Sequence, residues 1–189
     1  MNEKEAHKYS FADLMKWPEL PRYELIGGEA VLFATPMRRH QKIVGRLFNK
    51  IFNYLDGKQC EVYDAPLGAR LFQKDGEKTE DADTVLIPAI SVICDPNKLD
   101  DYGVKGAPDM IVEVLSPSNR RHDVWTKFHL YEKAGVREYW IVDPDKNTLA
   151  VHLLDEGKYG SPLFYIETAK VKVEVLDDCW IDLWEVFAE

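Results

Sequence analysis

The chain has 189 residues, of which 46% are hydrophobic, so it is long enough for one domain with a sizeable core and too short for two ordinary ones. Its formal net charge of -9 excludes a broad basic surface for nucleic acid, although a local groove stays open, because non-specific affinity comes mostly from Lys and Arg that neutralise phosphates. No apolar run approaches the roughly 20 residues that span a bilayer, so we predict a single domain over residues 1–189 without a membrane partner.

The first half of the chain predicts a short amphipathic segment, a hairpin and a long helix. The amphipathic segment covers residues 9–20, where Pro18 and Pro21 end it. Two short extended runs in RYELIGGEAVLF surround Gly27 and Gly28, which supply the positive φ angles of a tight hairpin turn. From residue 38 to residue 55, apolar side chains recur every four residues and predict a helix that Gly57 ends.

The second half of the chain alternates predicted strands with one further helix. Three strand candidates come first: EVYDAPLGARLF, TVLIPAISVICD and PDMIVEVL. A helix over residues 121–134 follows, closed by Gly135, and REYWIVDP is the next strand. The runs LAVHLLDEGKYG, SPLFYIETAKVKV and WIDLWEVF supply further strands and a short helix. This order predicts an α/β domain, a mixed β-sheet flanked by helices, with an N-terminal hairpin extension.

The cysteines favour a reducing environment. Cys60, Cys94 and Cys179 share no close spacing that suggests a metal site, and an odd number is a poor framework for disulfides. The N-terminus carries charge where a secretory signal needs an apolar core. We therefore expect no disulfide framework and a cytoplasmic location.

Two charged residues occupy positions that the surrounding patterns reserve for apolar side chains. Glu113 lies within the apolar run of PDMIVEVL. The inward stripe of the following helix, counted from Val124 at i, i+3, i+4, i+7 and i+10, places Lys127 on the face turned toward the sheet. Because a lysine is seldom fully buried without a partner, we expect Lys127 to pair with Glu113.

This pair also has two simpler interpretations. A buried ion pair alone is a weak sign of function, since an apolar pair of similar volume is often as stable or more so. Asp123, four residues before Lys127, offers an ordinary i,i+4 salt bridge on the helix face instead. Ionisable groups in a core more often mark a site when further polar residues converge there.

Several motifs follow one another in a characteristic order over residues 22–159. They are RYELIGGE, then His40 at the start of the first long helix, GAPDMIVEVLSPSN, the spacing of Asp123, Lys127 and Tyr131, and AGVREYWIVDP. This set resembles the Uma2 (Uma-two) family, which is similar to restriction endonucleases and belongs to the PD-(D/E)XK nuclease superfamily. The resemblance implies a restriction-endonuclease-like fold, DNA as the partner and Mg²⁺ or Mn²⁺ as the cofactor.

The chemistry implied by the resemblance is metal-assisted hydrolysis of phosphodiester bonds. Members of the superfamily hold the ion with two carboxylates at adjacent strand ends and place a lysine beside the attacking water. Mg²⁺ prefers hard oxygen ligands, and a lysine can orient a bound water and stabilise developing negative charge. By this resemblance Glu113 is a metal ligand. The usual lysine position, two residues later, is Leu115 here, so the lysine role passes to Lys127.

One position departs from the family pattern. Where the preceding strand usually has Pro-Asp, this chain reads LIPAISVICD and has Ala89, whose methyl group cannot bind a metal. Asp109, in the Pro-Asp before Glu113, is the other candidate ligand. At about 3.3 Å per residue, positions 109 and 113 of an extended strand lie about 13 Å apart, too far to share one ion easily. Asp109 therefore fits a supporting role at the start of the strand better, although the pattern match keeps it a candidate.

Two further residues have both a functional and a simpler interpretation, and two more have a mainly structural one. Glu24 matches an early acidic position of the family and can approach the metal, or it is an exposed strand carboxylate. His40 can contact a phosphate or carry a proton near neutral pH, or it has no catalytic role. Tyr131 is expected in the core with its hydroxyl bonded to the site, and Asp143 is expected to be a turn residue.

Two adjacent pairs of arginines can line one edge of a groove for DNA, or they can simply be solvated. These pairs are Arg38 with Arg39, and Arg120 with Arg121. A homodimer is plausible for a small nuclease that acts on duplex DNA, because two symmetric sites then act together. The apolar runs SPLFYIE and WIDLWEVF can serve such an interface, or they can pack in the core.

Together these observations predict a metal-dependent DNA endonuclease. Its candidate catalytic residues are Glu113, Lys127, Asp109, Glu24 and His40, with Glu113 and Asp109 as candidate metal ligands. Ala89 and the acidic net charge support an alternative. In that alternative the chain has a catalytically degenerate nuclease fold and serves as a DNA-binding or protein-assembly module.

Overall fold

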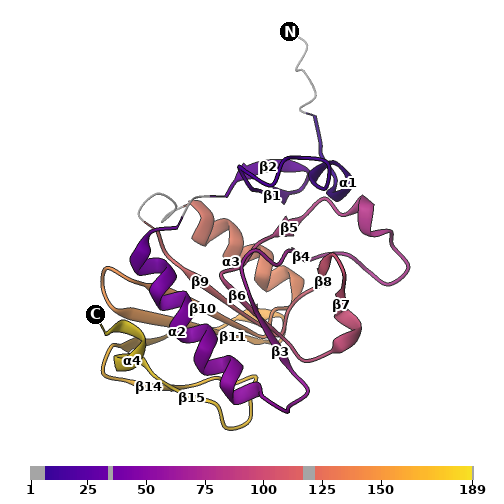
Figure 1. Cartoon of the computed structure of the whole chain (residues 1–189). Coiled ribbons are helices and arrows are strands. Elements are labelled where there is room, and N and C mark those ends of the chain that lie inside the picture. Colours follow the sequence, from indigo (N-terminus) through magenta and orange to yellow (C-terminus); the bar gives the residue numbers. More distant parts are fainter. Residues whose placement is uncertain (1–6, 34–35, 117–121, 189) are drawn as a thin grey trace.

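The computed structural model describes residues 7–33, 36–116 and 122–188, and for residues 122 and 123 it describes the backbone alone. Figure 1 shows β-sheets with helix α2 (Arg38–Leu55) on one side and helix α3 (His122–Ala134) on the other. Two short helices, α1 (Phe11–Leu14) and α4 (Leu183–Phe187), lie near the two ends of the chain. The α/β fold with a mixed sheet between helices, predicted from the sequence, is confirmed. No described helix is long and apolar enough to cross a membrane.

The main sheet has seven strands in the order β12-β11-β10-β9-β6-β3, with β13 also paired to β11. In chain order these strands are β3 (Glu61–Asp64), β6 (Ile90–Ile93), β9 (Met110–Val114), β10 (Glu138–Asp143), β11 (Thr148–Asp155), β12 (Lys158–Tyr159) and β13 (Leu163–Ile166). Strands β9 and β10 are parallel, and α3 connects them, while the other neighbours are antiparallel. The chain thus forms a β-α-β unit at the centre of the sheet.

A second sheet has six strands in the order β2-β1-β5-β4-β8-β7. In chain order they are β1 (Tyr23–Ile26), β2 (Glu29–Leu32), β4 (Ala69–Arg70), β5 (Val85–Leu86), β7 (Leu99–Asp100) and β8 (Gly103–Lys105). Two 3-10 turns, η1 (Thr79–Asp81) and η2 (Pro96–Lys98), lie in its connections, and β14 (Lys170–Lys172) pairs with β15 (Trp180–Asp182) near the C-terminus.

The predicted N-terminal hairpin is present as β1 and β2. Its turn residues, Gly27 and Gly28, have φ angles of +57° and +82°, a conformation that glycine adopts without a Cβ clash. A Cβ on Gly28 would also lie 2.9 Å from the Cβ of Lys8, so the chain passes too closely for a larger residue. The hairpin is more than an extension, because Leu25 pairs with Val85 and makes it part of the second sheet.

Two of the long strand candidates are split between the two sheets. EVYDAPLGARLF forms β3 and β4, with Pro66 between them, and TVLIPAISVICD forms β5 and β6, with Pro88 between them. A proline has no N–H for a strand ladder, so each run changes sheet near its proline. This change brings residues of both sheets to one place beside α3.

The core lies on both faces of the main sheet. One cluster packs α2 and the C-terminal segment against the sheet, and it includes Met110, Val112 and Val114 of β9. The other cluster lies between the sheet, α3 and the second sheet, and it includes Ile111 of β9. Because successive strand residues point to opposite faces, Glu113 shares the face of Ile111 and is directed toward α3.

The expectation of no disulfide was wrong. Cys60 directly precedes β3 and Cys94 directly follows β6, and the register pairs Glu61 with Ile93 beside them. The two cysteines therefore face each other across neighbouring strands and form a disulfide, while Cys179 is free and buried. An odd count hid this pair, since sequence spacing says nothing about cross-strand partners 34 residues apart.

The two apolar runs considered for an interface differ in the structure. In WIDLWEVF, Leu183, Val186 and Phe187 are buried, so most of this tail packs in the core. In SPLFYIE, the β13 residues Leu163, Phe164 and Ile166 are exposed at the edge of the main sheet.

Candidate functional site

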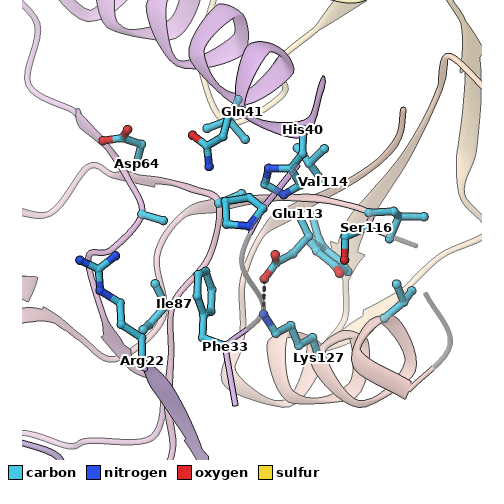
Figure 2. Close-up of a pocket in the computed structure, with 17 residues that line it drawn as sticks. Arg22, Phe33, His40, Gln41, Asp64, Ile87, Glu113, Val114, Ser116 and Lys127 are labelled. Atoms are coloured by element: carbon cyan, nitrogen blue, oxygen red, sulfur yellow. Dashed lines mark hydrogen bonds and ion pairs between the residues drawn. The ribbon is translucent and has the colours of Figure 1, made fainter. Parts of the chain in front are cut away.

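A cavity of about 160 Å³ lies where α2 begins, β9 ends and the first turns of α3 approach the sheet. Figure 2 shows His40 and Gln41 of α2 on one side of it and Lys127 of α3 on another, with Glu113 pointing between them. Both polar and apolar side chains line this cavity. Its volume corresponds to about five water molecules at about 30 Å³ each, which is enough for one small polar group and its solvent.

Lys127 joins two carboxylates that come from different sheets. Its Nζ lies 2.9 Å from Oε1 of Glu24 in β1 and 3.0 Å from Oε1 of Glu113 in β9. The contact between Lys127 and Glu113 that the helix stripe predicts is therefore present. Glu24 also accepts a hydrogen bond from the backbone N–H of Ile87 at 2.8 Å, so the hairpin carboxylate is held on two sides.

Tyr131, one turn after Lys127 on α3, donates its hydroxyl to Oε1 of Glu113 at 2.7 Å. The expected position of Tyr131 in the core, with its hydroxyl bonded to the site, is confirmed. The same oxygen of Glu113 thus accepts bonds from Lys127 and Tyr131, whereas its Oε2 accepts none from the described residues. Glu113 retains one carboxylate oxygen for a ligand in the cavity that it lines.

Burial and charge act in opposite directions on the pKa of Lys127. Burial disfavours the ammonium form, but the carboxylates of Glu113 and Glu24 outweigh it and raise the pKa above its ordinary value. Lys127 is therefore a permanent cation and hydrogen-bond donor at neutral pH, and it cannot act as a general base.

Burial raises the pKa of Glu24, and the nearby charge of Glu113 raises it further, against the opposing effect of Lys127. Burial followed by the charge of Glu113 also raises the pKa of the Tyr131 and Tyr139 hydroxyls well above the ordinary range. Both tyrosines are therefore neutral. Tyr131 donates to Glu113, whereas the buried Tyr139 hydroxyl has no hydrogen-bond partner among the described residues.

His40 reaches the cavity from the first turn of α2. Burial lowers the pKa of its imidazole, although the charge of Glu113 and a hydrogen bond with the Val114 backbone oppose the shift. Its Nδ1 is buried and has no hydrogen-bond partner among the described residues. The imidazole is therefore neutral near pH 7, with a ring nitrogen still to be satisfied.

Ala89 stands beside Glu113 at the point where the family pattern has its aspartate. Ile90 of β6 pairs with Val112 of β9, and continuing this antiparallel register by one residue places Ala89 opposite Glu113. Both residues line the cavity. Among the described residues, no three His, Cys, Asp or Glu side chains are close enough together to hold a metal ion.

The remaining donors fit a divalent ion weakly. Oε2 of Glu113 and the unsatisfied Nδ1 of His40 belong to side chains on the same cavity. Mg²⁺ is commonly held by one or two carboxylates, with waters and substrate phosphates completing its shell. The donor set is therefore compatible with a weak site that depends on the substrate.

Asp109 lies apart from the other candidates. It precedes β9, accepts a bond from the Cys94 N–H at 2.7 Å and pairs with Arg137 at 2.7 Å. It is not among the residues that line the cavity, whereas Glu24 is bonded to Lys127, and Glu113, Lys127 and His40 line it directly. The structure thus brings four of the five candidate residues together and leaves Asp109 at the opposite end of β9.

The other charged residues singled out from the sequence have local roles or lie outside the described part. Arg39 donates to the carbonyl of Pro144 and to Asn147, which ties α2 to the turn after β10. Asp143 accepts bonds from two backbone N–H groups of that turn, as expected of a turn residue. Arg38 is exposed on α2. Arg120, Arg121 and the side chain of Asp123 lie outside the described residues.

Sequence reasoning missed Arg22, Phe33, Gln41, Asp64 and Tyr139 as lining residues. The positions of Arg22 and Phe33 on the predicted hairpin could have indicated both of them. Arg22 is two residues before Glu24, so both point to the same face of the strand, and the hairpin register pairs Arg22 with Phe33. Tyr139 carried no such signal, because its neighbour Tyr131 comes from another element, with ring centroids 5.1 Å apart.

Comparisons with known proteins show the family and the fold. The model of the Uma2 family, described as "putative restriction endonuclease", matches residues 11–183. An uncharacterized protein of Synechocystis is 29% identical over 156 residues, covering 80% of this chain and 78% of its own. The crystal structure of a "putative nuclease belonging to DUF820" from Anabaena variabilis superposes with a TM-score of 0.72 at 20% identity, covering 95% of this chain and 97% of that one. The structural match shows a shared fold.

Proposed function

Since the chain belongs to the Uma2 family, we propose that it is a metal-dependent DNA endonuclease that hydrolyses phosphodiester bonds at the cavity beside Glu113. The observation that carries the proposal is that ionisable side chains from four different elements come together at one place. His40 from α2, Glu113 from β9 and Lys127 from α3 line one cavity, and Glu24 from the hairpin is bonded to Lys127, although these residues are far apart in sequence. Buried ion pairs that serve stability alone do not require an open cavity with an unsatisfied histidine beside them.

Each residue has a role that follows from its contacts. Lys127 is a fixed cation that stabilises negative charge developing on a phosphate and orients the attacking water. Glu24 and Tyr131 hold Lys127 and Glu113 in place from two sides. His40, neutral near pH 7, accepts a proton or binds through its free nitrogen. Asp109 supports the start of β9 through Arg137 and the Cys94 N–H, and as a metal ligand it is the weakest candidate.

A divalent ion, Mg²⁺ or Mn²⁺, would be held by Glu113 with His40 beside it. When bound, it would polarise the phosphate and lower the pKa of a water molecule. Two carboxylates, Glu24 and Glu113, surround the single cation Lys127, so the three side chains carry a net negative charge when both carboxylates are ionised and favour a further cation at this place. We also predict a homodimer that pairs through the exposed edge of β13, and a cytoplasmic location.

One observation favours a second function. Ala89 removes a carboxylate at the position opposite Glu113, and the overall charge of -9 weakens non-specific attraction to DNA. A degenerate nuclease fold that binds DNA, or assembles with protein, without cutting accounts for both facts. The two functions differ in a single outcome, cleavage.

The test is incubation of the purified chain with supercoiled plasmid in Mg²⁺ or Mn²⁺. Nicking that stops when the metal is chelated supports the endonuclease. Salt-dependent plasmid binding by the same preparation, without any nicking, assigns the chain to the second function instead.

A further inference from the structure

We infer that Arg22 and Phe33 form a subsite for one unstacked nucleotide of a single DNA strand, next to the phosphodiester at Glu113. Phe33 stacks on the base, and Arg22 binds an adjacent phosphate. This inference rests on the proposed function for the position of the phosphodiester. It gives a binding role to a wall of the cavity that has no part in the chemistry described above.

The two residues form one unit of the N-terminal hairpin. Strands β1 and β2 pair Tyr23 with Leu32, and the Phe33 N–H donates to the Arg22 carbonyl at 2.9 Å, which continues the ladder by one residue. Directly paired residues of an antiparallel ladder point to the same face. Both side chains line the cavity, on the wall opposite Glu113 and Lys127 (Figure 2).

The charge on this wall is free to bind an anion. Lys127 is neutralised by two carboxylates, whereas Arg22 is exposed and its guanidinium has no hydrogen-bond or ion-pair partner among the described residues. A guanidinium presents a planar set of donors that matches a phosphate group. Arg22 is therefore the cation of this cavity that is available to a phosphate flanking the site.

The ring of Phe33 has the surroundings of a stacking platform. Phe33 is half-buried, it makes no ring-to-ring contact with another described aromatic residue, and Ile87 lies beside it on the same wall (Figure 2). Proteins that bind single strands combine such rings with a cationic groove, because every base has a π-face to stack. A cavity of about 160 Å³ has room for one ring system.

The experiment uses the full chain with Glu113→Gln, so that no cleavage disturbs binding. The probe is a single-stranded oligodeoxynucleotide of about ten nucleotides that contains 2-aminopurine, whose fluorescence is quenched when the base stacks. We expect Phe33→Leu to weaken binding about tenfold and to abolish the protein-dependent change in fluorescence, while Phe33→Tyr preserves both. Arg22→Gln should make binding less salt-dependent, by about 0.7 in the slope of log K against log salt.

Phe164→Leu is the matched control, because Phe164 is an exposed phenylalanine on β13 that does not line the cavity. Unchanged binding and fluorescence in Phe33→Leu, or no binding of the probe at all, overturns the subsite. Plasmid nicking by the unmodified chain is measured separately. If nicking occurs and Phe33 has no effect, the subsite fails and the endonuclease stands; if Phe33-dependent binding occurs without nicking, the endonuclease fails and the subsite stands.

Discussion

Ala89 directly precedes β6, and the register that pairs Ile90 with Val112, continued by one residue, places it opposite Glu113 near the end of β9 at the cavity. Side chains paired in this way have Cβ atoms about 4.5–5.5 Å apart, a distance at which two carboxylates can bind one ion. The backbone therefore has the spacing of a two-carboxylate site, but one of the two carboxylates is absent.

Ala89→Asp should rebuild that pair of carboxylates. We expect the affinity for Mn²⁺, measured by titration calorimetry, to rise at least about tenfold over the parent, because hard divalent ions bind carboxylate oxygens most strongly. Ala89→Asn is the matched control, since it has nearly the same shape without the charge. Equal affinities in the aspartate and asparagine variants would show that position 89 does not face the ion.

Lys127→Met should destabilise the fold by about 3–5 kcal/mol, because it leaves the buried carboxylate of Glu24 and the partly buried one of Glu113 without their cation. Urea unfolding followed by circular dichroism measures the change. Lys158→Met removes a lysine that pairs with Glu132 at 3.0 Å on the surface, so it should cost about 0–1 kcal/mol. Similar losses in the two variants would argue against a cation-dependent core.

His152 should make stability depend on pH away from the site. It is buried on β11 near Tyr139, its Nδ1 has no partner among the described residues, and burial lowers its pKa despite an opposing bond with the Gly160 backbone. As the pH falls through 6.5, the unfolded chain therefore protonates its His152 before the folded chain does. The contribution of His152 to the free energy of unfolding is fully present above pH 6.5 and is lost below it.

Replacing His152 with asparagine should flatten the dependence of the free energy of unfolding on pH below 6.5. His129→Asn, a change of an exposed histidine on α3, is the comparison. If the free energy of unfolding of the two variants depends on pH in the same way, the buried imidazole of His152 does not make this contribution.

The disulfide between Cys60 and Cys94 can be tested by counting the thiols that react with a labelling reagent. Cys60 and Cys94 are joined and Cys179 is buried, so a thiol reagent should label the unreduced native chain slowly. After unfolding without reductant one cysteine should react, and after unfolding with reductant all three should react, as mass spectrometry can show. Three reactive thiols without reductant would contradict the cross-strand disulfide.

The sequence predicted features whose signals are local. Three such features are present: the helix α2, predicted from its apolar periodicity, the hairpin turn at Gly27 and Gly28, and the inward-facing Lys127 on α3. Each depends on a pattern within a single element. Two-residue strands such as β4 and β5 are too short to show a period, so the second sheet was not predicted. The approach of Glu24 to Lys127 depends on how the two sheets meet, and no pattern within either segment encodes that contact.

The most direct test of the account is the nicking rate of supercoiled plasmid in Mn²⁺, measured under single-turnover conditions for the parent chain and for Glu113→Gln. Glutamine keeps the size of the side chain and the acceptor for Tyr131, but it removes the charge that an ion and Lys127 require. We predict nicking by the parent and a loss of at least about 100-fold in the variant, the scale on which one electrostatic contact at a reacting centre acts. Equal rates in the two proteins, or no nicking by the parent, would contradict it.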